Sequence, residues 1–116
     1  MPLIYKISPR ALWREAEAAG RFTGAPIDRQ DGFIHFSTAA QVAETAARHF
    51  AGQRDLLLVT VEAATLGPSL RYEPSRGGDD FPHLYGALPL CAVVSVDELP
   101  LGEDGRHSFP AGILPA

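Results

Sequence analysis

Short apolar runs alternate along the chain with breaks of glycine, proline and charged residues, and most runs have the two-residue period of β-strands. The run at residues 56–61 is apolar everywhere except at Thr60. It therefore predicts a central strand covered on both faces. The other β segments that we expect are residues 3–7, 33–36, 70–73, 81–86 and 92–96.

Two helices are predicted in the first half of the chain. Ser8 stands before a proline and predicts the cap of a first helix, which Gly20 would end. Thr38 and Gln41 have the spacing of a capping box, which predicts that a second helix begins there and ends before Gly52. Because both helices precede most of the strands, the pattern predicts an α+β fold with mixed or antiparallel sheets.

The remaining segments carry no period. Residues 21–31 are rich in glycine, proline and aspartate and predict an irregular loop. The length of 116 residues fits one domain over 1–116, with a core at about 3–99 and an irregular tail at 100–116. The lone cysteine, Cys91, lies in an apolar run and is expected in the core.

Charge and composition narrow the partners. The formal net charge is −4, and no run of Lys and Arg follows the chain, so we expect no long duplex nucleic acid as a partner. No basic segment is followed by a long apolar stretch, which predicts neither a secretory signal nor a membrane span. We therefore expect a cytoplasmic protein that acts on a small molecule.

The strand at 33–36 presents a candidate catalytic histidine. Alternation places Phe33, His35 and Ser37 on one face. Ser37 and Thr38 come where this strand meets the start of a helix, whose free amides attract carboxylate or phosphate. The pattern thus predicts His35 as an acid–base residue beside an anion site. The alternative is that Ser37 and Thr38 only cap the helix and that His35 is structural.

A second candidate lies at residues 81–86, where alternation groups Phe81, His83 and Tyr85 on one side. An aromatic–histidine–aromatic face can stack a planar base and bond its edge. We predict His83 as the second catalytic residue and Tyr85 as a ligand contact. The alternative is a packed hairpin whose tyrosine hydroxyl reaches solvent.

Further ligand contacts come from the first strand and from a later arginine. Lys6 and Ser8 point to the same side of their strand, and Lys6 and Arg71 are cations that can reach a phosphate. The four histidines lack the close pairing of a zinc site, so no metal is expected.

Two motifs carry a family resemblance. Residues 31–37 (DGFIHFS) and 81–86 (FPHLYG) resemble the bacterial family called domain of unknown function 952, over residues 3 to about 99. That family is in turn similar to the ADP-ribosyltransferase fold, and its motif order most resembles the RNA 2′-phosphotransferase branch. The resemblance implies two small sheets that form a cleft with the two helices, and His35 as a histidine that faces a nucleotide such as NAD.

The sequence departs from that fold's pattern at two places. Lys6 and Ile7 stand where a histidine and a glycine grip the nicotinamide ribose, and no glutamate stands near His83 at the third motif. These departures argue against classical ADP-ribosyl transfer from NAD. The leading hypothesis is an enzyme, of the 2′-phosphotransferase type or related, that binds a nucleotide or a phosphorylated small molecule. The rival is a non-catalytic binding module with structural histidines.

Overall fold

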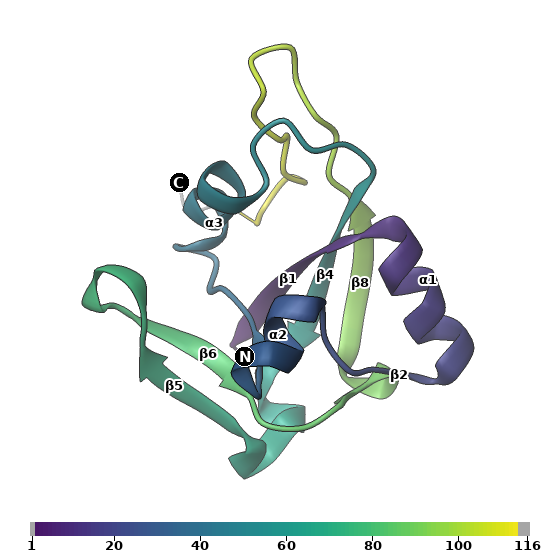
Figure 1. The fold of residues 1–116 in the computed structure, drawn as a ribbon, viewed down its shortest axis with the longest axis vertical. Coiled ribbons are helices and arrows are strands. Elements are labelled where there is room, and N and C mark those ends of the chain that lie inside the picture. The colour runs from purple at the N-terminus through teal and green to yellow at the C-terminus, as the bar shows by residue number, and fades with distance from the viewer. Residues whose placement is uncertain (1, 114–116) are drawn as a thin grey trace.

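The centre of the protein is a three-stranded antiparallel sheet. The computed structural model describes residues 2–113. Strands β1 (Leu3–Pro9), β4 (Leu56–Glu62) and β8 (Val93–Glu98) pair in the order β1-β4-β8. Figure 1 shows this sheet in the middle of the molecule, with α1 on one side and the β5–β6 hairpin on the other.

Two smaller sheets flank the central one. One pairs β2 (Arg21–Phe22) with β7 (Leu88–Pro89). The other has the order β3-β6-β5, with β3 (Ile34–His35), β6 (Asp80–Leu84) and β5 (Leu70–Pro74). All strand pairs in the described part of the chain are antiparallel. The α+β class is thus confirmed, with three small sheets in place of the two expected.

Three α-helices connect the strands in the first half of the chain. They are α1 (Arg10–Ala19), α2 (Pro26–Asp31) and α3 (Val42–His49). Short 3-10 helices follow at η1 (Ala63–Ser69), η2 (Arg76–Gly78) and η3 (Leu90–Ala92). Within residues 2–113, no helix has the length and apolar character needed to cross a membrane.

Both predicted helix starts are wrong in detail. Ser8 belongs to β1 and makes no cap, because the helix begins at Arg10 and Pro9 occupies the cap position. The Ser8 hydroxyl donates to the carbonyl of Pro9 instead. Only one half of the predicted capping box forms, as the amide of Thr38 donates to Oε1 of Gln41 at 3.0 Å. Regular helix begins later, at Val42.

The predicted loop at 21–31 contains β2 and helix α2. Pro26 occupies the first turn of α2, and the carboxylate of Asp28 accepts a hydrogen bond from the amide of Ala25 at 2.8 Å. Gly32 ends the helix in the left-handed conformation, at φ 87°. A helix of six residues is too short to show a hydrophobic period, which is why the pattern indicated a loop.

Strand β4 separates two hydrophobic cores, as predicted for a strand covered on both faces. Leu57, Val59 and Val61 pack into a core with Trp13 and Phe22 under α1. Leu56 and Leu58 pack on the opposite face, with Val42 and Ala46 of α3 and Leu99. The sheet therefore holds α1 and α3 on opposite sides.

In the second half of the chain, the predicted burial of Cys91 is wrong, and the tail packs against the core. Cys91 is exposed, not in the core, because η3 interrupts the apolar run and turns Ala92 inward in its place. In the tail, Phe109 and Ile113 pack against the core cluster under α3, and Leu101 pairs with His107. Residues 114–116 of the predicted tail lie outside the described residues.

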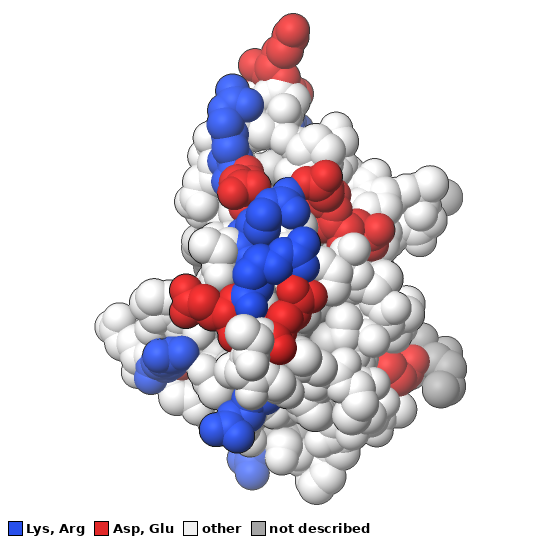
Figure 2. Space-filling view, turned by 90° about the vertical axis from the view of Figure 1, so that its right-hand side faces the viewer, with Lys and Arg blue, Asp and Glu red and all other residues white. Residues whose placement is uncertain are grey.

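The surface beside α1 carries charges of both signs. Figure 2 shows Lys and Arg side chains in a band with Asp and Glu on either side. Arg10 pairs with Asp55 at 2.7 Å and with Glu98, and Arg14 pairs with Glu17 at 2.7 Å. On this face the charges pair with one another instead of forming a patch of one sign.

Candidate functional site

A cavity of about 590 Å³ opens between β1, α2, α3 and the β3–β6 pair. Much of its wall is apolar, with Ile7, Leu12, Phe36 and Phe50 among the lining residues. Its polar side chains come from several elements and include Lys6, Asp28, Asp31, His35, Ser37 and His83. The volume lies within the range of small-molecule sites, roughly 300–1,000 Å³.

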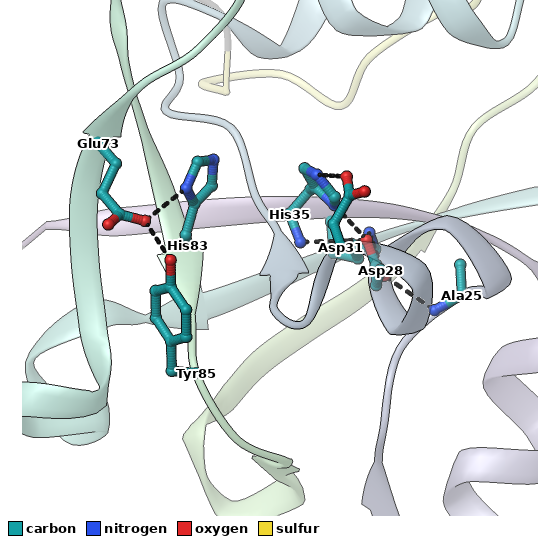
Figure 3. A network of polar contacts seen from close by, with 8 residues as sticks. Ala25, Asp28, Asp31, His35, Glu73, His83 and Tyr85 are labelled. Carbon is teal, nitrogen blue, oxygen red and sulfur yellow. Dashed lines mark hydrogen bonds and ion pairs between the residues drawn. The ribbon is translucent and has the colours of Figure 1, made fainter.

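Asp28 is the centre of the polar wall. Its side chain is 1% exposed and lies 2.8 Å from Nζ of Lys6 through Oδ2. Oδ1 lies 2.6 Å from Nδ1 of His35 and accepts the His35 backbone amide at 3.2 Å. With the bond from the Ala25 amide, this one carboxylate ties α2 to β1 and β3 (Figure 3).

Burial and charge act against each other in the Lys6–Asp28 pair. Burial would raise the pKa of Asp28, but the hydrogen bond from His35 and the charge of Lys6 outweigh it and lower that pKa to about 2. Burial also lowers the pKa of Lys6, and the attraction of Asp28 offsets only part of this effect. Asp28 is therefore an ionised group that holds a desolvated ammonium inside the cavity wall.

His35 lies between two carboxylates. Its Nδ1 contacts Asp28, and its Nε2 lies 3.0 Å from Oδ2 of Asp31. A neutral imidazole donates from one nitrogen only, so both contacts are hydrogen bonds only when the ring is protonated. The His35 side chain is 33% exposed. A protonated His35 can thus donate to a carboxylate from each ring nitrogen.

His83 has the opposite arrangement. Its Nδ1 lies 2.9 Å from Oε1 of Glu73, which also accepts the Tyr85 hydroxyl at 2.7 Å. The hydrogen bonds from His83 and Tyr85 lower the pKa of Glu73, so the carboxyl is ionised and accepts. The proton of a neutral His83 ring is then on Nδ1. Its Nε2 is buried and has no hydrogen-bond partner.

One phenylalanine brings the aromatic rings together. Phe33 stacks on His83, with 4.1 Å between ring centroids, and lies 4.7 Å from His35 and 5.2 Å from Tyr85. The His35 and His83 rings meet edge to face at 5.6 Å. The structure thus brings the two predicted catalytic histidines to one cavity wall.

The helix-start region supplies one cavity residue. Ser37 lines the cavity, and its hydroxyl lies 2.8 Å from the hydroxyl of Thr45. Its amide donates to the carbonyl of Tyr5 at 2.9 Å, and the amide of Thr38 donates to Gln41. Both amides that we expected to bind an anion are therefore occupied, and Thr38 is not among the cavity residues.

Three other predicted ligand contacts also lie outside the cavity wall. Ser8 is buried at 1% exposure and bonds within its own strand. Arg71 and Tyr85 are exposed on the β5–β6 hairpin, where the guanidinium lies 5.2 Å from the centroid of the tyrosine ring. Lys6, in contrast, does line the cavity.

Asp28, Asp31 and Glu73 were not predicted. Two features of the sequence could have indicated them. The proline two residues before Asp28 is typical of a helix start, and the turn before residue 80 is consistent with a hairpin. In the hairpin that this turn closes, Arg71 is opposite His83, so Glu73 is its diagonal neighbour. Within residues 2–113, no three His, Cys, Asp or Glu side chains are placed to hold a metal ion.

Comparisons with known proteins place the chain beside one family. The model of the family "Protein of unknown function (DUF952)" matches residues 7–96. The crystal structure of protein CC0527 from Caulobacter crescentus is 50% identical and superimposes with a TM-score of 0.88, covering 91% of this chain and 93% of that one. The solution NMR structure of CC0527 gives 51% identity, a TM-score of 0.82 and 91% coverage of each chain. No curated protein matches the chain.

Proposed function

The chain belongs to the DUF952 family, and we propose that its cavity binds a nucleotide or another phosphorylated small molecule. The observation that carries this proposal is the meeting of two histidines with different hydrogen-bond partners at the wall of one cavity of ligand size. Lys6 and Asp28, whose pKa values are lowered, line the same cavity, and perturbed titratable groups that gather in a concave site are the usual mark of a functional site.

The wall offers separate places for the two ends of such a ligand. Phe36, Phe50 and Phe81 provide an apolar surface for a planar base. At the polar end, Asp31 holds Nε2 of His35 from an exposed position, at 39% exposure. An exposed ion pair of this kind is worth little, so a phosphate can replace Asp31 as the partner of His35.

The order of the motifs supports a transferase of the RNA 2′-phosphotransferase type in an ADP-ribosyltransferase-like cleft. His35 stands at the ligand-facing histidine of that fold, and a protonated imidazole can donate to a leaving oxygen. Lys6 stands in place of the first-strand histidine and is committed to Asp28. We therefore place the binding of a phosphate group at this site, and the loss of the first-strand histidine argues against classical ADP-ribosyl transfer from NAD.

The rival function is a non-catalytic binding module in which the histidines brace the sheets. The stacking of His83 on Phe33 and its burial favour a structural part for that residue. In the rival, His35→Ala and His83→Ala each lower the free energy of unfolding by about 1–3 kcal/mol and no ligand binding is lost. Equilibrium denaturation combined with ligand binding separates the two.

The direct experiment is a thermal-shift series with AMP, 2′-AMP, ADP-ribose, NAD and a 2′-phosphorylated RNA dinucleotide. At a concentration of about 100 times Kd, a ligand adds about 2.7 kcal/mol and raises Tm by several degrees. His35→Ala removes this rise, whereas His107→Ala, which changes an imidazole outside the cavity, keeps it. If no compound raises Tm, or if His35→Ala responds as the wild type does, the proposal is wrong.

A further inference from the structure

His83 presents a buried nitrogen without a partner at the wall of the cavity. Its side chain is 5% exposed, yet Nε2 has no hydrogen bond. A buried polar atom without a partner is destabilising, and such atoms are rare in native proteins.

The surroundings of the ring prevent His83 from finding another partner. Phe33 stacks on its face at 4.1 Å, and Glu73 holds Nδ1 at 2.9 Å. The Tyr85 hydroxyl fixes Glu73 in turn. In Figure 3 the second ring nitrogen of His83 points away from Glu73, toward the side on which His35 lies.

The same contacts fix what this nitrogen offers. Glu73 is ionised and can only accept, so the ring proton is on Nδ1. In the neutral ring, Nε2 then carries a lone pair. A lone pair repels phosphate oxygens and accepts from a hydroxyl or an N–H group.

We infer that His83 is the hydrogen-bond acceptor for the ligand and that Nε2 takes a ligand hydroxyl or N–H. The inference rests on the proposed function, because it requires a ligand in this cavity. It adds the orientation of that ligand. The nucleoside part, with its ribose hydroxyls and base N–H groups, meets His83, while the phosphate meets His35. Glu73 is a positioning residue that sets the tautomer of the ring.

Phenol and anisole test this without assuming a nucleotide, because the two share a ring and only phenol donates. NMR titration of the full chain, followed at the His83 ring nitrogens, gives both affinities. One hydrogen bond predicts that phenol binds about threefold to tenfold more tightly than anisole. Phenol also shifts the Nε2 resonance, and the free protein shows the Nδ1–H tautomer.

Two variants keep the test decisive. Glu73→Leu removes the carboxylate that accepts from Nδ1, so no partner holds the proton on that nitrogen and the preference for phenol falls. His83→Phe keeps the stacking on Phe33 and removes the acceptor, with the same loss. His107→Ala, the control, retains the preference because this imidazole lies outside the cavity.

The inference is overturned by equal affinities in the wild type, by an Nε2–H tautomer in the free protein, or by no binding of either fragment near His83. It also fails if Glu73→Leu keeps the full preference for phenol. A preference for phenol without any nucleotide-induced rise in Tm would refute the nucleotide proposal and leave the acceptor role standing. The two ideas therefore fail separately.

Discussion

His35 and His83 are direct partners in the β3–β6 pairing, and each has a carboxylate on Nδ1. They differ at Nε2. That nitrogen contacts Asp31 in His35 and has no partner in His83. One register pair therefore places two imidazoles with different Nε2 surroundings at the cavity wall, 5.6 Å apart between ring centroids.

Asp28→Asn is expected to destabilise the protein strongly. Among the described residues, Asp28 is the only carboxylate that pairs with Lys6. The change removes the charge of Asp28 and leaves the ammonium of Lys6 buried. Breaking a buried pair in this way costs about 3–5 kcal/mol, which urea denaturation measures. Asp55→Asn breaks an exposed pair with Arg10 and is the control, with a loss of less than about 1 kcal/mol. Equal losses in the two variants would contradict the buried-pair argument.

Acid is expected to remove part of the stability through Asp28. The pKa of Asp28 in the folded protein is about 2, below the usual 3.8. The unfolded chain thus binds the proton first, so this contribution is complete above about pH 4 and lost as pH falls to about 2. The difference is worth about 2 kcal/mol. Denaturation of wild type and Asp28→Asn across this range checks it: their difference should shrink with falling pH, and a constant difference would refute it.

His35→Ala is expected to raise the pKa of Asp28. The hydrogen bond from His35 is the largest influence that opposes burial at this carboxyl. Without it, burial and the remaining bonds from Lys6 and Ala25 set the value. Carbon-13 NMR titration of the Asp28 carboxyl measures the change. A pKa that stays near 2 in the variant would show that Lys6 alone holds the carboxylate ionised.

Gly24→Ala is expected to disturb the site from outside the cavity. Gly24 has φ +108°, and an added Cβ would lie 2.9 Å from Cβ of Asp28. Gly20→Ala, at φ +87° with no neighbour within 4 Å, is the matched control. The control costs about 1 kcal/mol of conformational strain. Gly24→Ala costs more and also shifts the His35 ring resonances, and identical behaviour of the two variants would contradict this.

Alternation and register explain why part of the site was predictable. The two-residue period placed His35 and Ser37 on one face, and both line the cavity. The central strand at 56–61 followed from its unbroken apolar run. The carboxylates that set the proton arrangement were missed because Asp28 lies in a helix too short to show a period. Glu73 reaches His83 only through the pairing of β5 with β6, which no local pattern displays.

Helix α2 has six residues, far fewer than the roughly 12–15 that an isolated helix needs to persist in water. The hydrogen bonds that the Asp28 carboxylate accepts from Lys6 and His35 keep this helix in place. Its order is thus tied to the ionisation of a single side chain. Acid near pH 2 should release this segment while the three-stranded sheet remains intact, and the cavity would lose one wall before the protein unfolds.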